Sequence, residues 1–198
     1  MKAVIFDLGR VLIHYNHQTT LEAVAAISQV SLPELHALMV EVDHGLGIGE
    51  LSAADLYQFL VKRAGTTADM DTFLHAYAAG IVRDDEALAY AVALQEREDV
   101  TVGVISNTNE AHVLWLDEYV PELEQLDLVM MSNEVGLIKP DPAIFTLMLE
   151  LLDVQPGQVI FIDDIEVNTR AATALGITSL VHTDWAITRP ALEAWLAV

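Results

Sequence analysis

The sequence has no cysteine and few basic residues. Without a thiol there is no disulfide framework, no thiolate metal site and no cysteine nucleophile. Nine lysines and arginines face thirty acidic residues in a chain of 198, which gives a formal net charge of −21. A surface this acidic repels phosphate backbones and anionic lipid headgroups. We therefore expect neither nucleic-acid binding nor membrane binding.

Long apolar runs are also missing. The first run, residues 3–6, stops at Asp7 and is too short for the apolar segment of a signal peptide. No later run reaches the roughly 18 uncharged residues that a membrane span requires. We expect a cytoplasmic protein on these grounds. Hydrophobic residues still make up 53% of the chain, so its acidity does not indicate disorder.

Five short apolar segments have the character of strands that are buried on both faces, as in a parallel sheet. They span residues 3–6, 102–105, 128–131, 159–162 and 178–181. Helix signals lie between them: Ser31 with Glu34 and Ser52 with Asp55 have capping-box spacing, and Asp141 precedes a proline. This alternation predicts an α/β fold with a Rossmann-like, doubly wound parallel sheet.

One long stretch, residues 16–84, interrupts the alternation and is predicted to be a helical insertion. The core would then comprise residues 1–15 and 85–198. Within the insertion, the glycine-rich segment 45–49 is expected to be a loop. It follows no strand and lacks the Lys-Ser/Thr of a phosphate-binding loop, so we assign it no phosphate-binding role.

Polar residues follow the predicted strands. They are thus placed at the carboxyl ends of the strands, where ligands bind in open α/β sheets. Closely spaced carboxylates repel one another, and a hard cation such as Mg²⁺ relieves that repulsion. A carboxylate can also attack phosphorus, while a hydroxyl, an ammonium and backbone N–H groups hold the phosphoryl oxygens. The residues in question are Asp7, Ser106, Asn107, Lys139, Asp163 and Asp164.

Receiver domains of response regulators use similar ingredients in a different order. Their acidic pair follows the first strand, and the phosphorylated aspartate follows a later one. Here the single Asp7 comes first and the Asp163-Asp164 pair comes last. The order therefore disfavours a receiver.

Four segments resemble, in order, the motifs of the haloacid dehalogenase superfamily: residues 6–12, 105–107, 139–140 and 161–164 with Asn168 beyond. The predicted insertion resembles the small helical cap of that superfamily, the C1 type. Further phrases are similar to those of bacterial alpha-D-glucose-1-phosphate phosphatases. These phrases are residues 106–109, 118–122 and 175–179.

The resemblance implies a Mg²⁺-dependent phosphatase that acts on a small phosphorylated metabolite, which we expect to be a sugar phosphate. It implies a nucleophile, a set of metal ligands and a phosphate-binding group, in a monomer or a homodimer. Asp7 would be the nucleophile and a metal ligand. Further metal ligands would be Gly9 (backbone carbonyl), Asp164 and Asp163, with Asp163 alternatively orienting Lys139. Phosphate would be bound by Ser106, the N–H of Asn107 and Lys139, and Asn168 would lie in the outer metal shell.

Gly9 departs from the family pattern, because most members have a general-acid aspartate at this position. Three explanations stay open. The leaving group needs little protonation, as with an anomeric phosphate. Alternatively the insertion supplies the proton donor. In the third, the protein is a slow enzyme or a phosphometabolite-binding module. The candidate donors are His14, His17, His44 and Glu50.

Arg10 departs from the pattern as well. It either binds a second anionic group of the substrate or pairs with the acidic surface. A 2-haloacid dehalogenase is a further alternative. Such an enzyme uses the first aspartate to attack carbon and needs no metal, and the acidic pair Asp163-Asp164 argues against it.

Overall fold

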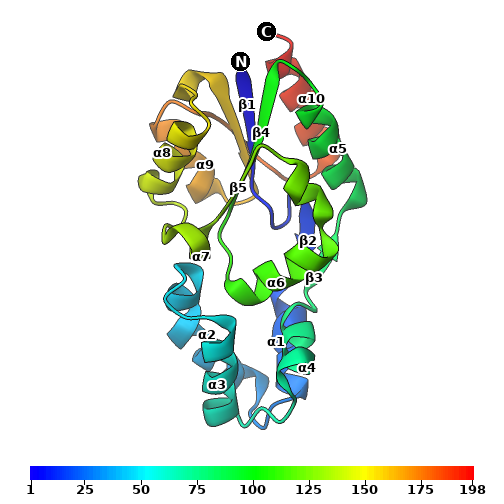
Figure 1. Cartoon of the computed structure of the whole chain (residues 1–198), viewed down its shortest axis with the longest axis vertical. Coiled ribbons are helices and arrows are strands. Elements are labelled where there is room, and N and C mark those ends of the chain that lie inside the picture. Colours follow the sequence, from blue (N-terminus) through cyan, green and yellow to red (C-terminus); the bar gives the residue numbers. More distant parts are fainter.

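The computed structural model describes residues 1–198 and contains the predicted sheet (Figure 1). Its five strands are parallel, in the order β5-β4-β1-β6-β7. The predicted strand positions are confirmed to within two residues. The strands are β1 (Lys2–Phe6), β4 (Val100–Ser106), β5 (Leu128–Met131), β6 (Val159–Asp163) and β7 (Thr178–Val181).

Helices cover both faces of this sheet (Figure 1). One face carries α5 (Asp85–Gln95) and α10 (Trp185–Leu196), and the other carries α8 (Pro142–Leu151) and α9 (Glu166–Ala174). Strand β1 is buried on both sides: Val4 and Phe6 belong to the apolar cluster under α5 and α10, whereas Ala3 and Ile5 belong to the one under α8 and α9. Burial on both faces explains the uninterrupted apolar run of this strand.

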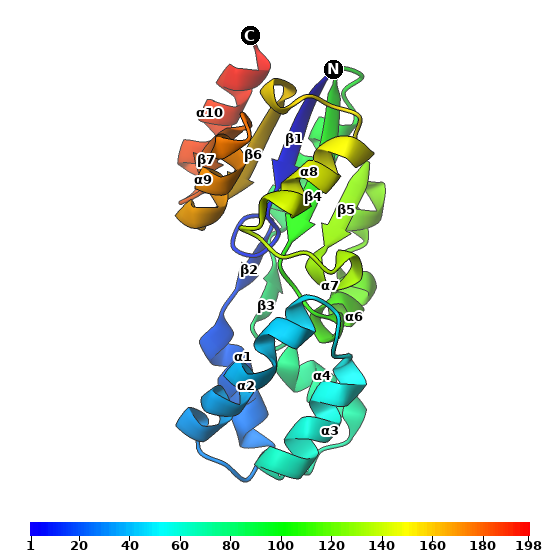
Figure 2. The ribbon, with the colours of Figure 1, turned by 90° about the vertical axis from the view of Figure 1, so that its left-hand side faces the viewer.

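Residues 17–77 form a separate four-helix unit, here called the helical insertion. It comprises α1 (His17–Ala26), α2 (Leu32–Gly47), α3 (Ala53–Ala64) and α4 (Met70–Tyr77). Its own apolar cluster includes the fully buried Leu35, Leu56 and Phe73. Figure 2 shows it beyond the carboxyl ends of the strands, opposite the two termini. The unit therefore faces the edge of the sheet where ligands are expected.

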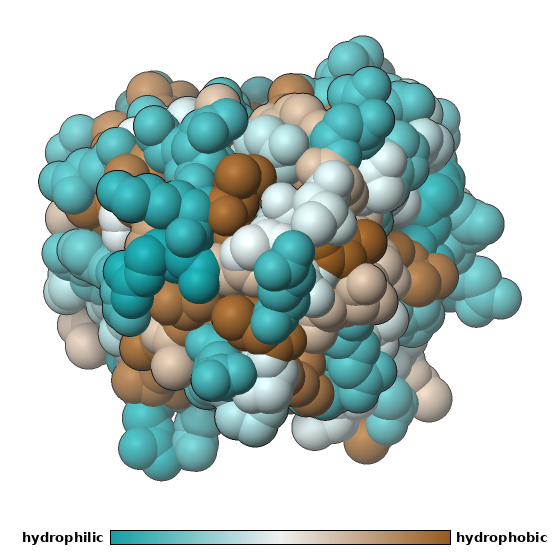
Figure 3. All heavy atoms as spheres, turned by 90° about the horizontal axis from the view of Figure 1, so that it is seen from below, coloured by the Kyte–Doolittle hydropathy of each residue, from teal (hydrophilic) through white to brown (hydrophobic).

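The predicted helix starts are confirmed. Glu34 accepts a hydrogen bond from the Ser31 N–H at 2.9 Å, and Asp55 accepts one from the Ser52 N–H at 3.0 Å. Asp141 accepts one from the N–H of Ala143 at the start of α8. None of the helices combines the length and the apolar character of a membrane-spanning segment. Seen from the insertion end, the surface mixes hydrophilic and hydrophobic residues over the whole face (Figure 3).

Two features of the fold differ from the sequence prediction. Strands β2 (Ile13–Tyr15) and β3 (Ile81–Arg83) pair in an antiparallel ribbon that joins the insertion to the core. Each has three residues, too few for a periodic signal. The prediction of a loop over residues 45–49 was also wrong for Gly45–Gly47. Helix α2 continues to Gly47 because Val42 and Leu46 extend its buried apolar face.

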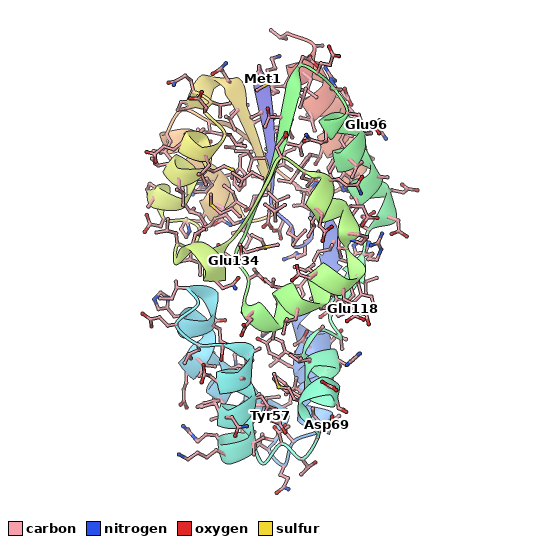
Figure 4. All side chains as sticks on the ribbon, viewed as in Figure 1. Met1, Tyr57, Asp69, Glu96, Glu118 and Glu134 are labelled. Atoms are coloured by element: carbon pink, nitrogen blue, oxygen red, sulfur yellow. The ribbon has the colours of Figure 1, made fainter.

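The insertion meets the core at α7 (Ser132–Val135), and Glu134 marks this junction in Figure 4. The buried Ser132 hydroxyl donates to the carbonyl of Gly47 at 2.7 Å and accepts from the N–H of Thr108 at 2.9 Å. Gly49 has φ of +74°, and a Cβ there would lie 1.9 Å from the carbonyl oxygen of Asn133. The close backbone approach at this junction therefore requires glycine.

Candidate active site

The carboxyl ends of β1, β4 and β6 bring the predicted polar residues together. Because β1 pairs with both β4 and β6, Asp7 lies between Ser106 on one side and Asp163 on the other. A cavity of about 490 Å³ lies between this edge and the helical insertion. The residues Asp7, Ser106, Lys139, Asp163 and Asp164 are here called the sheet-edge cluster.

Lys139 is the centre of the sheet-edge cluster. Its side chain is 1% exposed. The ammonium donates to Asp7 Oδ1 at 2.6 Å, to Asp163 Oδ2 at 2.8 Å and to the carbonyl of Ile105 at 2.8 Å. These three acceptors use all three ammonium hydrogens. The lysine therefore holds Asp7 in one place at the wall of the cavity.

The side chain of Asn107 fixes the backbone of Lys139. Its Nδ2 donates to the Lys139 carbonyl at 2.9 Å, and its Oδ1 accepts from the Lys139 N–H at 2.8 Å. This leaves the backbone N–H of Asn107, rather than its side chain, for phosphate binding. The hydroxyl of Ser106, which also lines the cavity, makes no hydrogen bond within the chain.

Asp163 is fully buried, and both of its carboxylate oxygens are occupied. Oδ1 accepts from the N–H of Ile165 at 2.7 Å and from Asn168 at 3.2 Å. Oδ2 accepts from Lys139 at 2.8 Å and from Asn168 at 3.0 Å. Of the two roles that the sequence left open for Asp163, this environment favours orientation of Lys139. Asn168 acts on the cluster through Asp163.

Asp164 forms an ion pair with Arg10, 3.0 Å apart. Arg10 has φ of +63°, in the left-handed region that residues other than glycine rarely occupy. Its guanidinium lies over the site rather than on the distant acidic surface, and it lines the cavity. Arg10 is thus paired with a carboxylate of the site itself. The sequence interpretation had considered only a second anionic group of the substrate or the acidic surface as its partner.

The three carboxylates offer oxygen atoms that all lie within 4.8 Å of one another. Only two cationic side chains, Lys139 and Arg10, are paired with them. One negative charge is therefore left uncompensated. Hard oxygen donors with surplus negative charge suit Mg²⁺, so the residues present fit the predicted cation.

Burial raises the pKa of Asp7 to about 6, Lys139 acts to lower this pKa and Asp163 acts to raise it. Burial likewise raises the pKa of Asp164, against the opposing charge of Arg10. The sheet-edge cluster therefore carries desolvated carboxylates whose charge is costly without a cation. Such perturbed groups in a cleft are typical of functional sites.

Gly9 lies in the cavity wall two residues beyond Asp7. A Cβ at this position would have the Cβ of Tyr15 as its nearest neighbour, at 4.0 Å. Steric crowding therefore does not explain the missing general acid. Among the four predicted replacement donors, only His17 lines the cavity; His14 lies 3.6 Å from Asp84, and His44 and Glu50 lie outside the cavity lining.

The opposite side of the cavity was missed by the sequence interpretation. Tyr15 of β2, Asp43 of α2, Tyr77 of α4 and His112 of α6 (Glu110–Tyr119) line it, and are here called the insertion wall. Figure 1 shows α6 crossing between the sheet and the insertion. The one available signal was position: His112 stands in the first turn of the helix after a strand end.

The pKa of His112, a member of the insertion wall, is strongly perturbed. Burial lowers its pKa to about 4, and an interaction with the Tyr77 backbone carbonyl acts in the opposite direction. Its Nε2 is buried and unpartnered. A buried polar atom without a partner costs about 1–3 kcal/mol. The imidazole is neutral at physiological pH, so it is no proton donor of the imidazolium type.

Comparison with known proteins places these features in a family. The model of the haloacid dehalogenase-like hydrolases matches residues 1–176. The chain belongs to this family. The four motif segments identified in the sequence lie within the matched residues.

Several members of the haloacid dehalogenase-like family are similar over most of the chain. The D-ribitol-5-phosphate phosphatase of Bacteroides thetaiotaomicron is 26% identical, with 89% of each chain covered. The phosphoglycolate phosphatase of Rhodospirillum rubrum is 29% identical over 91% of this chain and 78% of its own. Two mouse proteins also match, but the chain spans only 7% of acyl-CoA dehydrogenase family member 10 and 18% of bifunctional epoxide hydrolase 2.

A solved structure shares the fold. The family enzyme bt-2542 of Bacteroides thetaiotaomicron, in complex with magnesium and inorganic phosphate, superimposes with a TM-score of 0.84. It is 24% identical, and the match covers 94% of this chain and 98% of that one. At this identity the likeness establishes the common fold alone.

Proposed function

We propose that the protein is a phosphatase that hydrolyses a small phosphorylated metabolite through an aspartyl-phosphate on Asp7. The observation that carries this proposal is the Asp7–Lys139 contact of 2.6 Å at the edge of an open cavity. A carboxylate fixed in this way can attack phosphorus from one face. The relatives named as phosphatases support the same chemistry.

In the proposed reaction an oxygen of Asp7 attacks phosphorus, and the bond from phosphorus to the alcohol oxygen breaks. The Ser106 hydroxyl and the Asn107 N–H bind phosphoryl oxygens. Lys139 supplies positive charge beside the nucleophile. Water then attacks the acyl phosphate, which releases inorganic phosphate and regenerates the carboxylate. Preorganised donors of this kind stabilise charge that develops in the transition state.

Mg²⁺, when bound, would supply charge neutralisation for the phosphoryl oxygens. Asp7, Asp164 and the backbone carbonyl of Gly9 are the proposed ligands. Asp163, with both oxygens already hydrogen-bonded, is proposed to hold Lys139 instead. Arg10 would have to share Asp164 with the cation.

We further propose that residues 16–84 act as a cap on a core of residues 1–15 and 85–198. The insertion stands over the strand ends and supplies part of the cavity lining. A cap in this position excludes bulk water from the first step. The β2–β3 ribbon, which connects the two parts, is the natural hinge.

Gly9 favours a leaving group that departs with little protonation. Of the other cavity-lining carboxylic acids, Asp164 is paired with Arg10 and Asp43 belongs to the helical insertion. Burial holds His112 neutral, and only His17 of the predicted replacement donors lines the cavity. Among sugar phosphates, an anomeric phosphate has a more acidic leaving oxygen than a primary alcohol ester. A sugar 1-phosphate is therefore the proposed substrate type.

The proposal is tested by phosphate release from a panel of sugar 1-phosphates, sugar 6-phosphates and phosphorylated acids, with and without Mg²⁺. We expect metal-dependent release that is lost in Asp7→Asn, a variant of nearly the same shape. Circular dichroism would check that the variant is folded. Release unchanged in Asp7→Asn would contradict the proposed nucleophile.

The same panel separates the alternatives. A chloride-releasing reaction with 2-chloropropionate in the presence of a chelator would indicate a dehalogenase. Ligand binding without turnover of any compound would indicate a binding module. Either result would replace the phosphatase proposal.

A further inference from the structure

The insertion wall differs from the sheet-edge cluster in its charge. Lys139 and Arg10 are the only lysine and arginine that line the cavity, and both are already paired with carboxylates of the core. Asp43, on the insertion side, takes part in no ion pair and no hydrogen bond. The part of the substrate that points away from the phosphate therefore meets a free carboxylate and no free cation.

Aromatic side chains make up the rest of the insertion wall. The ring of His112 lies 4.8 Å from that of Tyr77 and 5.5 Å from that of Tyr15, measured between centroids. Asn109 Nδ2 lies 3.4 Å from both Tyr77 Oη and His112 Nδ1. With Nδ1 as the acceptor of this contact, the hydrogen of the neutral imidazole lies on Nε2.

Two groups of this wall are thus left for a ligand. The Nε2 of His112 is a buried donor without a partner, on a residue that lines the cavity. The carboxylate of Asp43 is an acceptor without a partner. Substrate hydroxyls can accept a hydrogen bond from the first group and donate one to the second. A carboxylate or phosphate can accept from His112, but meets like charge at Asp43.

We propose that the insertion wall selects an uncharged, hydroxyl-bearing leaving group and rejects substrates that carry a second anionic group. Asp43 is the discriminating residue, and His112, between Tyr15 and Tyr77, binds a substrate hydroxyl. This inference rests on the phosphatase function proposed above and names its substrate class. The relatives act on both a polyol phosphate and a phosphorylated acid, so family membership does not decide the point.

The electrostatic reach of Asp43 is consistent with this role. Burial is the main cause that raises the pKa of Tyr77, and the charges of Tyr15 and Asp43 add to it. Burial also raises the pKa of Tyr15, where Asp43 again contributes. The carboxylate therefore acts on both phenol groups of the wall. Asp43 is itself exposed, so its repulsion of a second anionic group is screened in part by solvent, but it still disfavours a like-charged partner.

The test compares glycerol 3-phosphate with 3-phosphoglycerate, which differ in one CH₂OH against one carboxylate. We expect wild-type kcat/KM to favour the polyol phosphate by about tenfold or more. Asp43→Asn should shrink that preference by about tenfold, because it removes the charge and keeps the shape. Asp71→Asn, an exposed change of equal charge on α4 outside the cavity, should leave the preference as it is.

Binding is measured separately, so that the two proposals can fail independently. Calorimetry on Asp7→Asn gives dissociation constants for both compounds without turnover. A polyol preference there that Asp43→Asn reduces would support the selectivity even if no compound is hydrolysed. Equal or better binding of 3-phosphoglycerate, or a preference that changes less than twofold in Asp43→Asn, would overturn it while leaving a phosphatase intact.

Discussion

The two sides of the cavity are built in different ways. The sheet-edge cluster consists of residues at the carboxyl ends of strands together with Lys139 from the turn before α8, and short hydrogen bonds join Lys139 to Asp7 and Asp163. The insertion wall takes its residues from four elements far apart in the sequence, and leaves Asp43 and His112 Nε2 without partners. Rigid, preorganised groups suit the chemical step, whereas unpaired groups suit recognition of a variable leaving group.

The largest effect is expected where the sheet-edge cluster loses its only buried lysine. Lys139→Met leaves Asp7 and Asp163 facing each other without a cation, and raises the pKa of Asp7 further, because Lys139 lowers it in the wild type. We expect phosphatase activity to fall by about 10²–10³. The free energy of unfolding should fall by about 3 kcal/mol.

Phosphate release and urea unfolding in the presence of a chelator measure these two effects. Lys62→Met provides the control, because Lys62 is an exposed residue of α3. A free energy of unfolding in Lys139→Met that equals that of the wild type would show that the lysine does not hold the two carboxylates.

The insertion wall should instead affect the stability of the protein at acidic pH. The pKa of His112 is lowered by burial to about 4, below the value of about 6.5 expected in the unfolded chain. Between these values the unfolded chain takes up a proton that the folded protein does not. This proton uptake favours the unfolded chain. The free energy of unfolding therefore falls by about 3 kcal/mol as the pH is lowered from 6.5 toward 4.

His112→Asn should therefore be less sensitive to acid than the wild type over that pH window. Thermal unfolding at half-unit pH steps measures the difference. The exposed His75→Asn of α4 serves as the control and should follow the wild-type curve. Identical pH profiles for wild type and His112→Asn would mean that His112 is not held neutral in the fold.

A smaller effect is expected at the junction between the two sides. Gly49→Ala places a Cβ against the carbonyl of Asn133 at a backbone conformation that disfavours alanine. We expect a loss of about 1–3 kcal/mol and faster proteolysis near residue 49. Gly157→Ala, where an added Cβ meets nothing within 4 Å, should be close to neutral. Equal stability of the two variants would argue against the tight junction.

The smallest expected effect is an increase in hydrolytic activity. A Cβ at Gly9 meets only Tyr15 Cβ at 4.0 Å, so Gly9→Asp can be accommodated beside Asp7. If proton donation is what the site lacks, this variant should hydrolyse glucose 6-phosphate about tenfold faster. Hydrolysis of glucose 1-phosphate should change little. An equal change for both esters would contradict the leaving-group explanation of Gly9.

The sequence allowed prediction of one side of the site much better than the other. Asp7, Ser106 and Asp163 follow apolar strands, so a parallel sheet necessarily brings them to a common edge. Tyr77 and His112 become neighbours only through the packing of α4 against α6, and no spacing in the chain encodes that contact. For the same reason the sequence did not predict the hydrogen bonds between the Asn107 side chain and the Lys139 backbone, which depend on how the Lys139 loop packs against the end of β4.

The central claim is that Asp7 becomes phosphorylated during turnover. It is tested most directly by rapid quenching of the enzyme with substrate and Mg²⁺, followed by borohydride reduction and peptide mass spectrometry. Reduction of an acyl phosphate converts aspartate to homoserine. We expect this conversion at Asp7 alone, and only with substrate present. Steady release of phosphate with unmodified Asp7 at every quench time would contradict the account.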